Sequence, residues 1–227
     1  MNPVGRAVHQ ALRWSVGGFL NWLYTRGAGM YPWVARAVSN GHWPTWVRTV
    51  AGQIPLEARV LEVGFGPGYA QEVWAARGQP AWGADLSLAM ARRAARRLRE
   101  QGHSPRLVQA RAQALPFPAA SVDWVLSTFP TAYILEPATA REFARVLRPG
   151  GHLWVLVSVE GGLLRLWARW AQWAARLSGR AASLQDAFHK VYAPLGLQGT
   201  VTWEPLPGRA RGILFRAVKG EPTTTGV

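Results

Sequence analysis

The stretch Val60-Leu61-Glu62-Val63-Gly64-Phe65-Gly66-Pro67-Gly68 decides the fold of this chain. Strand-forming residues run directly into three glycines that stand two positions apart. Glycine has no Cβ, so the turn can be tight and a ligand can come close to its backbone. A helical pattern follows over residues 69–77, and the free N–H groups at a helix start can face the same ligand. We therefore expect a strand, a ligand-binding turn and a helix.

Strand and helix patterns continue to alternate after this turn. Strands are expected at 59–63, 81–84, 106–110, 122–127 and 152–158, and helices at 69–77, 87–101 and 138–147. A long helical segment and two further strands, at 200–203 and 212–218, complete the pattern. Such alternation predicts βαβ units around a parallel sheet. Residues 1–57 show no such alternation; they are rich in aromatic residues, and we expect them to be helical.

The composition supports a folded domain and excludes several kinds of site. The chain has 227 residues, of which 49% are hydrophobic and 17% charged, so it can bury a core. It contains no cysteine, which excludes disulfides, thiolate zinc sites and a cysteine nucleophile. The histidines have no metal-ligand spacing, so we expect no metal. The lack of cysteine favours a cytoplasmic protein.

The charge is strongly positive, +14 from 26 basic and 12 acidic residues. A basic surface attracts nucleic acid, anionic lipid or acidic substrates, and a compositional bias toward arginine explains the charge equally well. The arginines of the helix at 87–101 are interpreted as its solvated face: Arg92, Arg93, Arg96, Arg97 and Arg99. The uncharged apolar stretch 14–25 is too short to span a bilayer, so no transmembrane segment is expected.

Asp85 ends the second expected strand, 21 positions after Gly64. A carboxylate there can accept hydrogen bonds from ribose hydroxyls, as in dinucleotide-binding enzymes. The dinucleotide fingerprint has glycine or alanine three positions after its second glycine, whereas Tyr69 stands there in this chain. Glu62 also stands two positions before the first glycine. The pattern therefore departs from that of nicotinamide-dependent enzymes.

The quoted stretch resembles motif I of class I S-adenosylmethionine-dependent methyltransferases. Four more blocks continue the resemblance in order: Gly83-Ala84-Asp85-Leu86-Ser87-Leu88-Ala89-Met90, Ala112-Gln113-Ala114-Leu115-Pro116-Phe117-Pro118, Ser121-Val122-Asp123-Trp124-Val125 and Arg145-Val146-Leu147-Arg148-Pro149-Gly150-Gly151. The chain is similar in particular to the ubiquinone/menaquinone-biosynthesis-like small-molecule methyltransferases. The resemblance implies an α/β fold. The fold would be Rossmann-like, with a doubly wound seven-stranded sheet that is mostly parallel and has one antiparallel strand. N-terminal helices would form a cover over it.

The resemblance implies that S-adenosylmethionine is the cofactor, and it assigns residues around it. These are Tyr31, Glu62, Gly64, Phe65, Gly66, Gly68, Asp85, Leu86, Ala112, Gln113 and Thr128. The glycine loop would border the methionine part, and Glu62 would orient the loop and reach the amino group. Asp85 would hold the ribose. Leu86 would lie against the adenine, to which Ala112 would offer its backbone N–H.

Some positions depart from the family's pattern. Relatives commonly have aspartate just before Ala112, to accept from the adenine amino group, but Arg111 cannot accept a hydrogen bond. Gln113 or a backbone carbonyl would have to replace it. Tyr31 matches a tyrosine that often approaches the cofactor, although Pro32 follows it in place of the usual aspartate.

The sequence identifies no catalytic base. Transfer from an activated donor requires alignment and exclusion of water more than proton abstraction. His189 and Tyr192 follow the fifth expected strand, and we interpret them as packing or surface residues. Asp123 is interpreted as a structural residue at the start of the fourth strand, and Ser87 as the N-cap of the helix that follows it. The fourth strand ends in Ser127-Thr128-Phe129, with no amide or carboxylate to receive a nucleobase amino group, which makes nucleic acid a less favoured partner.

We therefore expect a single methyltransferase domain over residues 1–219 and a frayed tail at 220–227. The domain would comprise a helical cover (1–57), a cofactor-binding core (58–158) and a helical acceptor-side insertion (159–195). It would methylate a small, apolar or lipid-like acceptor. An RNA methyltransferase and a non-catalytic S-adenosylmethionine-binding protein are the alternatives.

One helical segment carries a further expectation about partners. Within residues 163–177 a polar stripe repeats every three or four positions beside tryptophans: Arg165, Arg169, Gln172 and Arg176. It is expected to be either a core-packed helix or a lid that touches an anionic membrane surface. In the second case the protein would be peripheral to the membrane.

Overall fold

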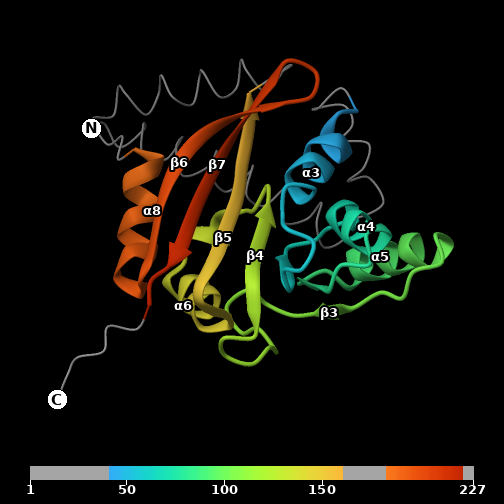
Figure 1. Ribbon diagram of the computed structural model, residues 1–227, viewed down its shortest axis with the longest axis horizontal. Coiled ribbons are helices and arrows are strands. Elements are labelled where there is room, and N and C mark those ends of the chain that lie inside the picture. The colour runs from blue at the N-terminus through green and yellow to red at the C-terminus, as the bar shows by residue number, and fades with distance from the viewer. Residues whose placement is uncertain (1–40, 161–182, 222–227) are drawn as a thin grey trace, which may run out of the picture.

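The computed structural model describes residues 41–160 and 183–221 (Figure 1). Its helices are α3 (Trp43–Ala51), α4 (Tyr69–Ala76), α5 (Leu88–Glu100), α6 (Pro137–Val146) and α8 (Leu184–Tyr192), with the short 3₁₀ helices η1 (Ala132–Leu135) and η2 (Ala193–Leu195). Its strands are β1 (Val60–Val63), β2 (Ala81–Asp85), β3 (Leu107–Gln109), β4 (Val122–Thr128), β5 (Leu147–Glu160), β6 (Leu197–Leu206) and β7 (Ala210–Lys219). Tyr31 and the segment 163–177 lie outside these residues.

The strands form one seven-stranded sheet in the order β3-β2-β1-β4-β5-β7-β6. β1 to β5 are parallel to their neighbours, whereas β7 runs antiparallel to both β5 and β6. The predicted fold class is thus confirmed, including the single antiparallel strand. The chain moves outward from β1 to β3 in one direction and from β4 in the other, so the sheet has a switch point between β1 and β4.

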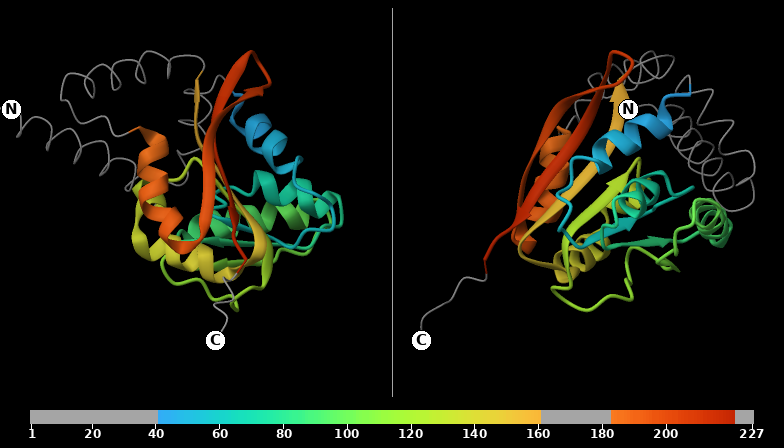
Figure 2. Two further views of the ribbon diagram at one scale, coloured as in Figure 1. Left: turned by 60° about the vertical axis from the view of Figure 1, so that its left-hand side comes forward. Right: turned by 45° about the vertical axis from the view of Figure 1, so that its right-hand side comes forward.

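Helices cover both faces of the sheet, as the two views of Figure 2 show. On one face, α6 and α8 bury Phe143, Phe188 and Tyr192 against Phe215 of β7. On the other face, α3 and α4 bury Trp46 and Trp74 in a second apolar cluster. Every residue of β1 is buried, because a central parallel strand lies between two such layers.

Local sequence signals explain where several elements begin. Ser87 caps α5 by accepting from the Met90 N–H at 3.3 Å, as expected. Ser183 and Asp186 form a reciprocal capping box at α8. The last three strands are longer than their predicted ranges. β7 pairs with β6 over all ten residues and with β5 from Arg211 to Val218, and the first residue of β5, Leu147, pairs with β4. Turn and edge residues there weaken the strand pattern in the sequence.

Three side-chain contacts fasten α3 to distant parts of the chain. Its Trp46 Nε1 donates to the Pro207 carbonyl, in the turn between β6 and β7, at 3.0 Å. On its other side, Arg48 pairs with Glu72 of α4 at 2.7 Å. Trp74 Nε1 donates to the Ala51 carbonyl at 3.1 Å. The position of α3 over the sheet is therefore set by both the first helix after β1 and the last hairpin.

None of the helices within 41–160 and 183–221 is long and apolar enough to cross a membrane.

Asp123 is structural, as expected, and joins the starts of three strands. Its carboxylate accepts from the Arg59 backbone N–H at 2.7 Å and from both the Arg59 and Arg148 guanidiniums. Hydrogen bonds from Arg59 are the main reason that the pKa of Asp123 falls to about 2. A carboxyl with a lowered pKa stabilises the fold above its unfolded pKa and loses that contribution as the pH falls toward the folded value.

We therefore expect Asp123→Asn to lower the free energy of unfolding by about 1–2 kcal/mol at pH 7, allowing for solvent screening of the pair. The difference between variant and wild type should shrink between pH 4 and pH 2, as the wild-type carboxyl takes up its proton. Urea unfolding across this pH range measures it. A difference that stays constant down to pH 2 would contradict the assignment.

Candidate functional site

The glycine loop between β1 and α4 contains three left-handed residues. The φ angles of Gly64, Gly66 and Gly68 are +77°, +52° and +83°, a region that other residues enter only with strain. A Cβ on Gly64 would lie 2.6 Å from the Tyr133 hydroxyl, and one on Gly68 would lie 2.8 Å from the Ala94 Cβ. A Cβ on Gly66 would meet no atom of the described residues within 4 Å. The outer two glycines are thus required by packing, and the middle one borders space that the described part of the chain leaves open.

Asp85 connects this loop to the end of β2. Its side chain is buried, with Oδ2 accepting from the Gly66 N–H and Oδ1 from the Ser87 N–H, both at 2.8 Å. Burial raises the pKa of Asp85, and these two backbone donors oppose the rise. A carboxylate has about four acceptor positions, so Asp85 can hold the loop and still accept hydrogen bonds from a diol.

Glu62, on β1 below the loop, is fully buried. Its Oε2 accepts from the Gln71 side-chain amide at 2.9 Å, while its Oε1 has no hydrogen-bond partner among the described residues. The pKa of Glu62 is raised to about 8, mainly by burial; the Gln71 hydrogen bond opposes this rise and the nearby Asp85 charge contributes to it. A buried acceptor without a donor is costly, so this oxygen marks a place where a ligand donor would be stabilising.

Tyr133, on η1, is a site residue that the sequence did not reveal. Its hydroxyl lies 2.9 Å from Ser127 Oγ, which donates to the Val63 carbonyl at 2.8 Å. Burial raises the pKa of Tyr133 far above its usual value, so the phenol stays neutral. The hydroxyl group packs against Gly64 and supports the loop. No local motif points to Tyr133, because the contact depends on how η1 folds back over β4.

A small pocket lies between the glycine loop and α3. It is lined by Trp43, Val47, Gly64, Phe65, Gly66, Pro67, Tyr69 and Thr128. Its cavity volume is about 10 Å³, roughly the space needed for one water molecule. Among the described residues, the lining leaves room for a group of about that size, such as a methyl, and includes no charged side chain.

The remaining predicted residues lie along the edge formed by β2 and β3. Leu86, directly after β2, is 55% exposed. Ala112 and Gln113 stand in the turn after β3, where Gln113 donates to the Glu136 carboxylate at 2.7 Å. Arg111 is exposed and bridges to Ala114 through its backbone. The structure therefore brings the loop, Asp85 and Thr128 close together, with Leu86 and the 112–113 turn further out at the same strand ends.

Other candidate residues lie away from the loop. Tyr192 is buried on α8 and donates to the Ile134 carbonyl at 2.7 Å, and His189 is exposed on the same helix. Both match their predicted packing and surface roles. Within 41–160 and 183–221, no group of three or more His, Asp or Glu residues is placed to hold a metal ion.

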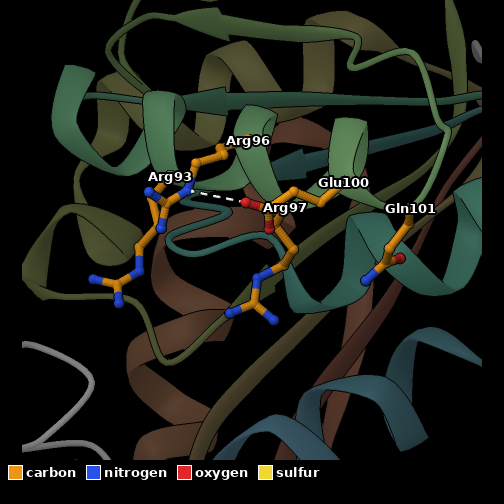
Figure 3. Close-up of a pocket in the computed structure, with 5 residues that line it drawn as sticks. All are labelled: Arg93, Arg96, Arg97, Glu100 and Gln101. Atoms are coloured by element: carbon orange, nitrogen blue, oxygen red, sulfur yellow. Dashed lines mark ion pairs between the residues drawn. The ribbon is translucent and has the colours of Figure 1, made fainter.

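A second hollow lies on the outer side of α5 (Figure 3). Its lining consists of Arg93, Arg96, Arg97, Glu100 and Gln101. Arg96 pairs with Glu100 at 3.5 Å, and Arg97 and Gln101 both donate to Glu72. Arg96 is exposed, as predicted, whereas Arg97 is half-buried between Glu72 and the Tyr69 ring.

Comparison with known proteins agrees with this geometry. Residues 61–155 match the family model of a methyltransferase domain. The uncharacterized methyltransferase YdaC of Bacillus subtilis is 37% identical over 95 residues, which are 40% of this chain and 51% of that protein. The malonyl-[acyl-carrier protein] O-methyltransferase of Erwinia pyrifoliae is 33% identical over 127 residues, 56% of this chain and 45% of that protein. The chain thus spans about half the length of these relatives.

Solved structures share the fold at low sequence identity. The YcgJ protein of Bacillus subtilis has a TM-score of 0.55 at 18% identity, covering 78% of this chain and 98% of that one. A putative S-adenosylmethionine-dependent methyltransferase of Methanococcus maripaludis has a TM-score of 0.59 at 15% identity, covering 88% and 94%. The family match over the glycine loop thus shows a methyltransferase domain at residues 61–155, and these structures share its fold and strand order.

Proposed function

We propose that this protein transfers a methyl group from S-adenosylmethionine to a small, apolar or lipid-like acceptor. The observation that carries the proposal is the buried Glu62 oxygen, which has no partner among the described residues and lies directly below a glycine loop whose middle residue borders space that no described residue fills. An amino group is the donor that such an oxygen lacks. The methionine part of S-adenosylmethionine provides one at the end of a chain thin enough to lie along the loop.

The other residues at the strand ends fit the rest of that molecule. Asp85 has acceptor positions left for the two ribose hydroxyls after holding Gly66 and Ser87. The exposed Leu86 side chain offers an apolar surface to adenine. Ala112 and Gln113 supply backbone and amide groups beyond it. These assignments follow the order of the strands, since β1, β2 and β3 are neighbours.

S-adenosylmethionine supplies a methyl carbon on a positively charged sulfur, and when an acceptor lone pair bonds to that carbon the carbon–sulfur electron pair leaves with the sulfur. The protein has to align the two partners and exclude water. The pocket under α3 suits this task, because its walls are aromatic, aliphatic or backbone. Glu62 accepts from Gln71 and would face the ammonium group, Asp85 holds the loop, and Tyr133 stays neutral, so none of these three is assigned as a base for the acceptor. An acceptor proton would therefore pass to solvent.

The pocket lining and one relative indicate the class of acceptor. The apolar pocket favours an uncharged group at the reacting atom. The matching Erwinia relative acts, by its name, on an acyl-carrier-bound malonyl group, which supports a small acceptor over a nucleic acid. A lipid-like acceptor would bring the protein to a membrane surface as a peripheral protein.

Calorimetry with S-adenosylhomocysteine tests the cofactor site. Asp85→Ala should weaken binding by about 1.5–3 kcal/mol, the range of hydrogen bonds to a charged group. Asp186→Ala, at the capping box of α8, is the matched control and should leave binding unchanged. If wild-type protein binds a nicotinamide dinucleotide but not S-adenosylhomocysteine, the proposal is wrong.

A labelled methyl donor tests the acceptor class. Label from a cell extract should appear in the organic-soluble small-molecule fraction. Label in the RNA fraction would favour an RNA methyltransferase. Tight cofactor binding with no labelled fraction would favour the non-catalytic alternative.

The glycine positions give a prediction that separates folding from binding. Gly66→Ala places its Cβ in open space, so the fold should lose only about 1–2 kcal/mol through the left-handed backbone, while S-adenosylhomocysteine binding falls at least tenfold. Gly68→Ala forces a contact with Ala94 and should mainly lower the thermal midpoint. Thermal melts and calorimetry on both variants measure this. Normal binding by Gly66→Ala would show that the ligand does not approach there.

Glu62 predicts a pH dependence of cofactor binding. With a folded pKa of about 8, Glu62 is protonated at neutral pH and must lose its proton to pair with an ammonium group. Affinity should therefore rise roughly tenfold per pH unit below pH 8 and then level off. Calorimetry in buffers of different ionisation heat should detect release of about one proton. Glu62→Gln should bind more weakly and with a flat pH profile, and a flat profile in the wild type would contradict the pairing.

A further inference from the structure

Phe129, the residue after β4, has a backbone conformation that aromatic residues rarely adopt. Its φ is +51°, and only Ala120 and Arg209 share a positive φ among the described non-glycine residues. Those two are exposed and lie in turns. Phe129 is half-buried at the carboxyl end of a central strand, where a left-handed aromatic residue is strained and has to be held by its surroundings.

Two contacts hold Phe129 in this conformation. Its N–H donates to the Leu156 carbonyl of β5 at 2.7 Å. Its ring packs on Trp43, with centroids 3.9 Å apart and planes at 33°. Trp43 in turn opens α3, the helix fastened through Trp46 and Arg48 to the β6–β7 turn and to α4. The strained backbone of Phe129 therefore places its ring on Trp43, which α3 holds in a fixed position.

The sheet places this aromatic pair on a defined side of the pocket. The proposed cofactor contacts lie at the ends of β1 and β2, with Gly66 and Asp85. Phe129 follows β4, on the other side of the switch point between β1 and β4. Trp43 and Thr128 line the pocket from that side. A methyl group in the pocket would thus have the cofactor on the β1 side and the aromatic pair on the β4 side.

We propose that Trp43 and Phe129 form the acceptor-side wall of the methyl-transfer site and select acceptors with a flat, uncharged group beside the atom that is methylated. This inference rests on the proposed function. Trp43 lines the pocket and Phe129 packs on it, so the pair offers one aromatic surface to a flat partner. A carboxylate at the same place would lose water, and the described cations over Tyr69, Arg48 and Arg97, are both already paired with Glu72.

Fluorescence titration of the S-adenosylhomocysteine complex tests this wall, with 2-naphthol as a flat neutral probe and 2-naphthoate as its charged counterpart. Naphthol should bind at least about tenfold more tightly than naphthoate. Phe129→Leu and Trp43→Leu keep an apolar side chain but remove one ring, and each should weaken naphthol binding about fivefold to tenfold. Phe129→Gly, whose backbone is relaxed, should lose naphthol affinity as Phe129→Leu does. Ala120→Gly relaxes a similar φ elsewhere and should change nothing.

The outcomes separate this inference from the proposed function. The Phe129 variants should keep their S-adenosylhomocysteine affinity within about twofold, because the ring lies outside the cofactor contacts. If the wild type does not bind S-adenosylhomocysteine, the proposed function fails. If it does, the aromatic wall is wrong in any of three cases: naphthol does not bind, naphthoate binds equally well, or naphthol binding is the same in Phe129→Leu.

Discussion

The carboxylate of Asp85 holds the glycine loop and the second strand of the sheet together, and the architecture of the site depends on it. The loop has left the hydrogen-bonding ladder of the sheet at Gly64, so its backbone needs other acceptors. Asp85 supplies one to Gly66 and closes the distance between two neighbouring strand ends. The left-handed glycines allow several backbone conformations of the loop, and the Asp85–Gly66 hydrogen bond stabilises one of them. Tyr133 and Ala94 then pack against the outer two glycines.

A second acid lies close to the first, and the two have different surroundings. Asp85 is satisfied by backbone donors, whereas Glu62 has one oxygen bound to Gln71 and one without a partner among the described residues. Burial is the main reason that the pKa of Glu62 is raised, and the nearby Asp85 charge adds to the rise. If no ligand bound here, an apolar residue in place of Glu62 would make the fold more stable. That the chain keeps a destabilising buried glutamate at this position supports a binding role for Glu62.

The sequence predicts the parts of this molecule that depend on local order along the chain. The strand order, the glycine loop, the Ser87 cap and the structural role of Asp123 all follow from short motifs and their spacing. Residues brought in by tertiary packing were not predicted. Tyr133 reaches Gly64 only because η1 folds over β4, and Trp43 and Phe129 meet across 86 positions. The full length of β5 to β7 depends on cross-strand pairing, which weakly patterned strand residues do not reveal.

The hydrogen bond between Trp46 and Pro207 joins residues that are 161 positions apart. This hydrogen bond connects α3 to the β6–β7 turn, so it can form only after the ribosome has synthesised that turn. While the ribosome makes the chain, the glycine loop and its strands can pair long before residue 207 emerges, but α3 lacks its second anchor until then. Closing so long a loop is entropically costly and slow. The Trp46 indole therefore gains its hydrogen-bond acceptor only when the last hairpin is in place, and a chain truncated before residue 207 leaves that N–H without it.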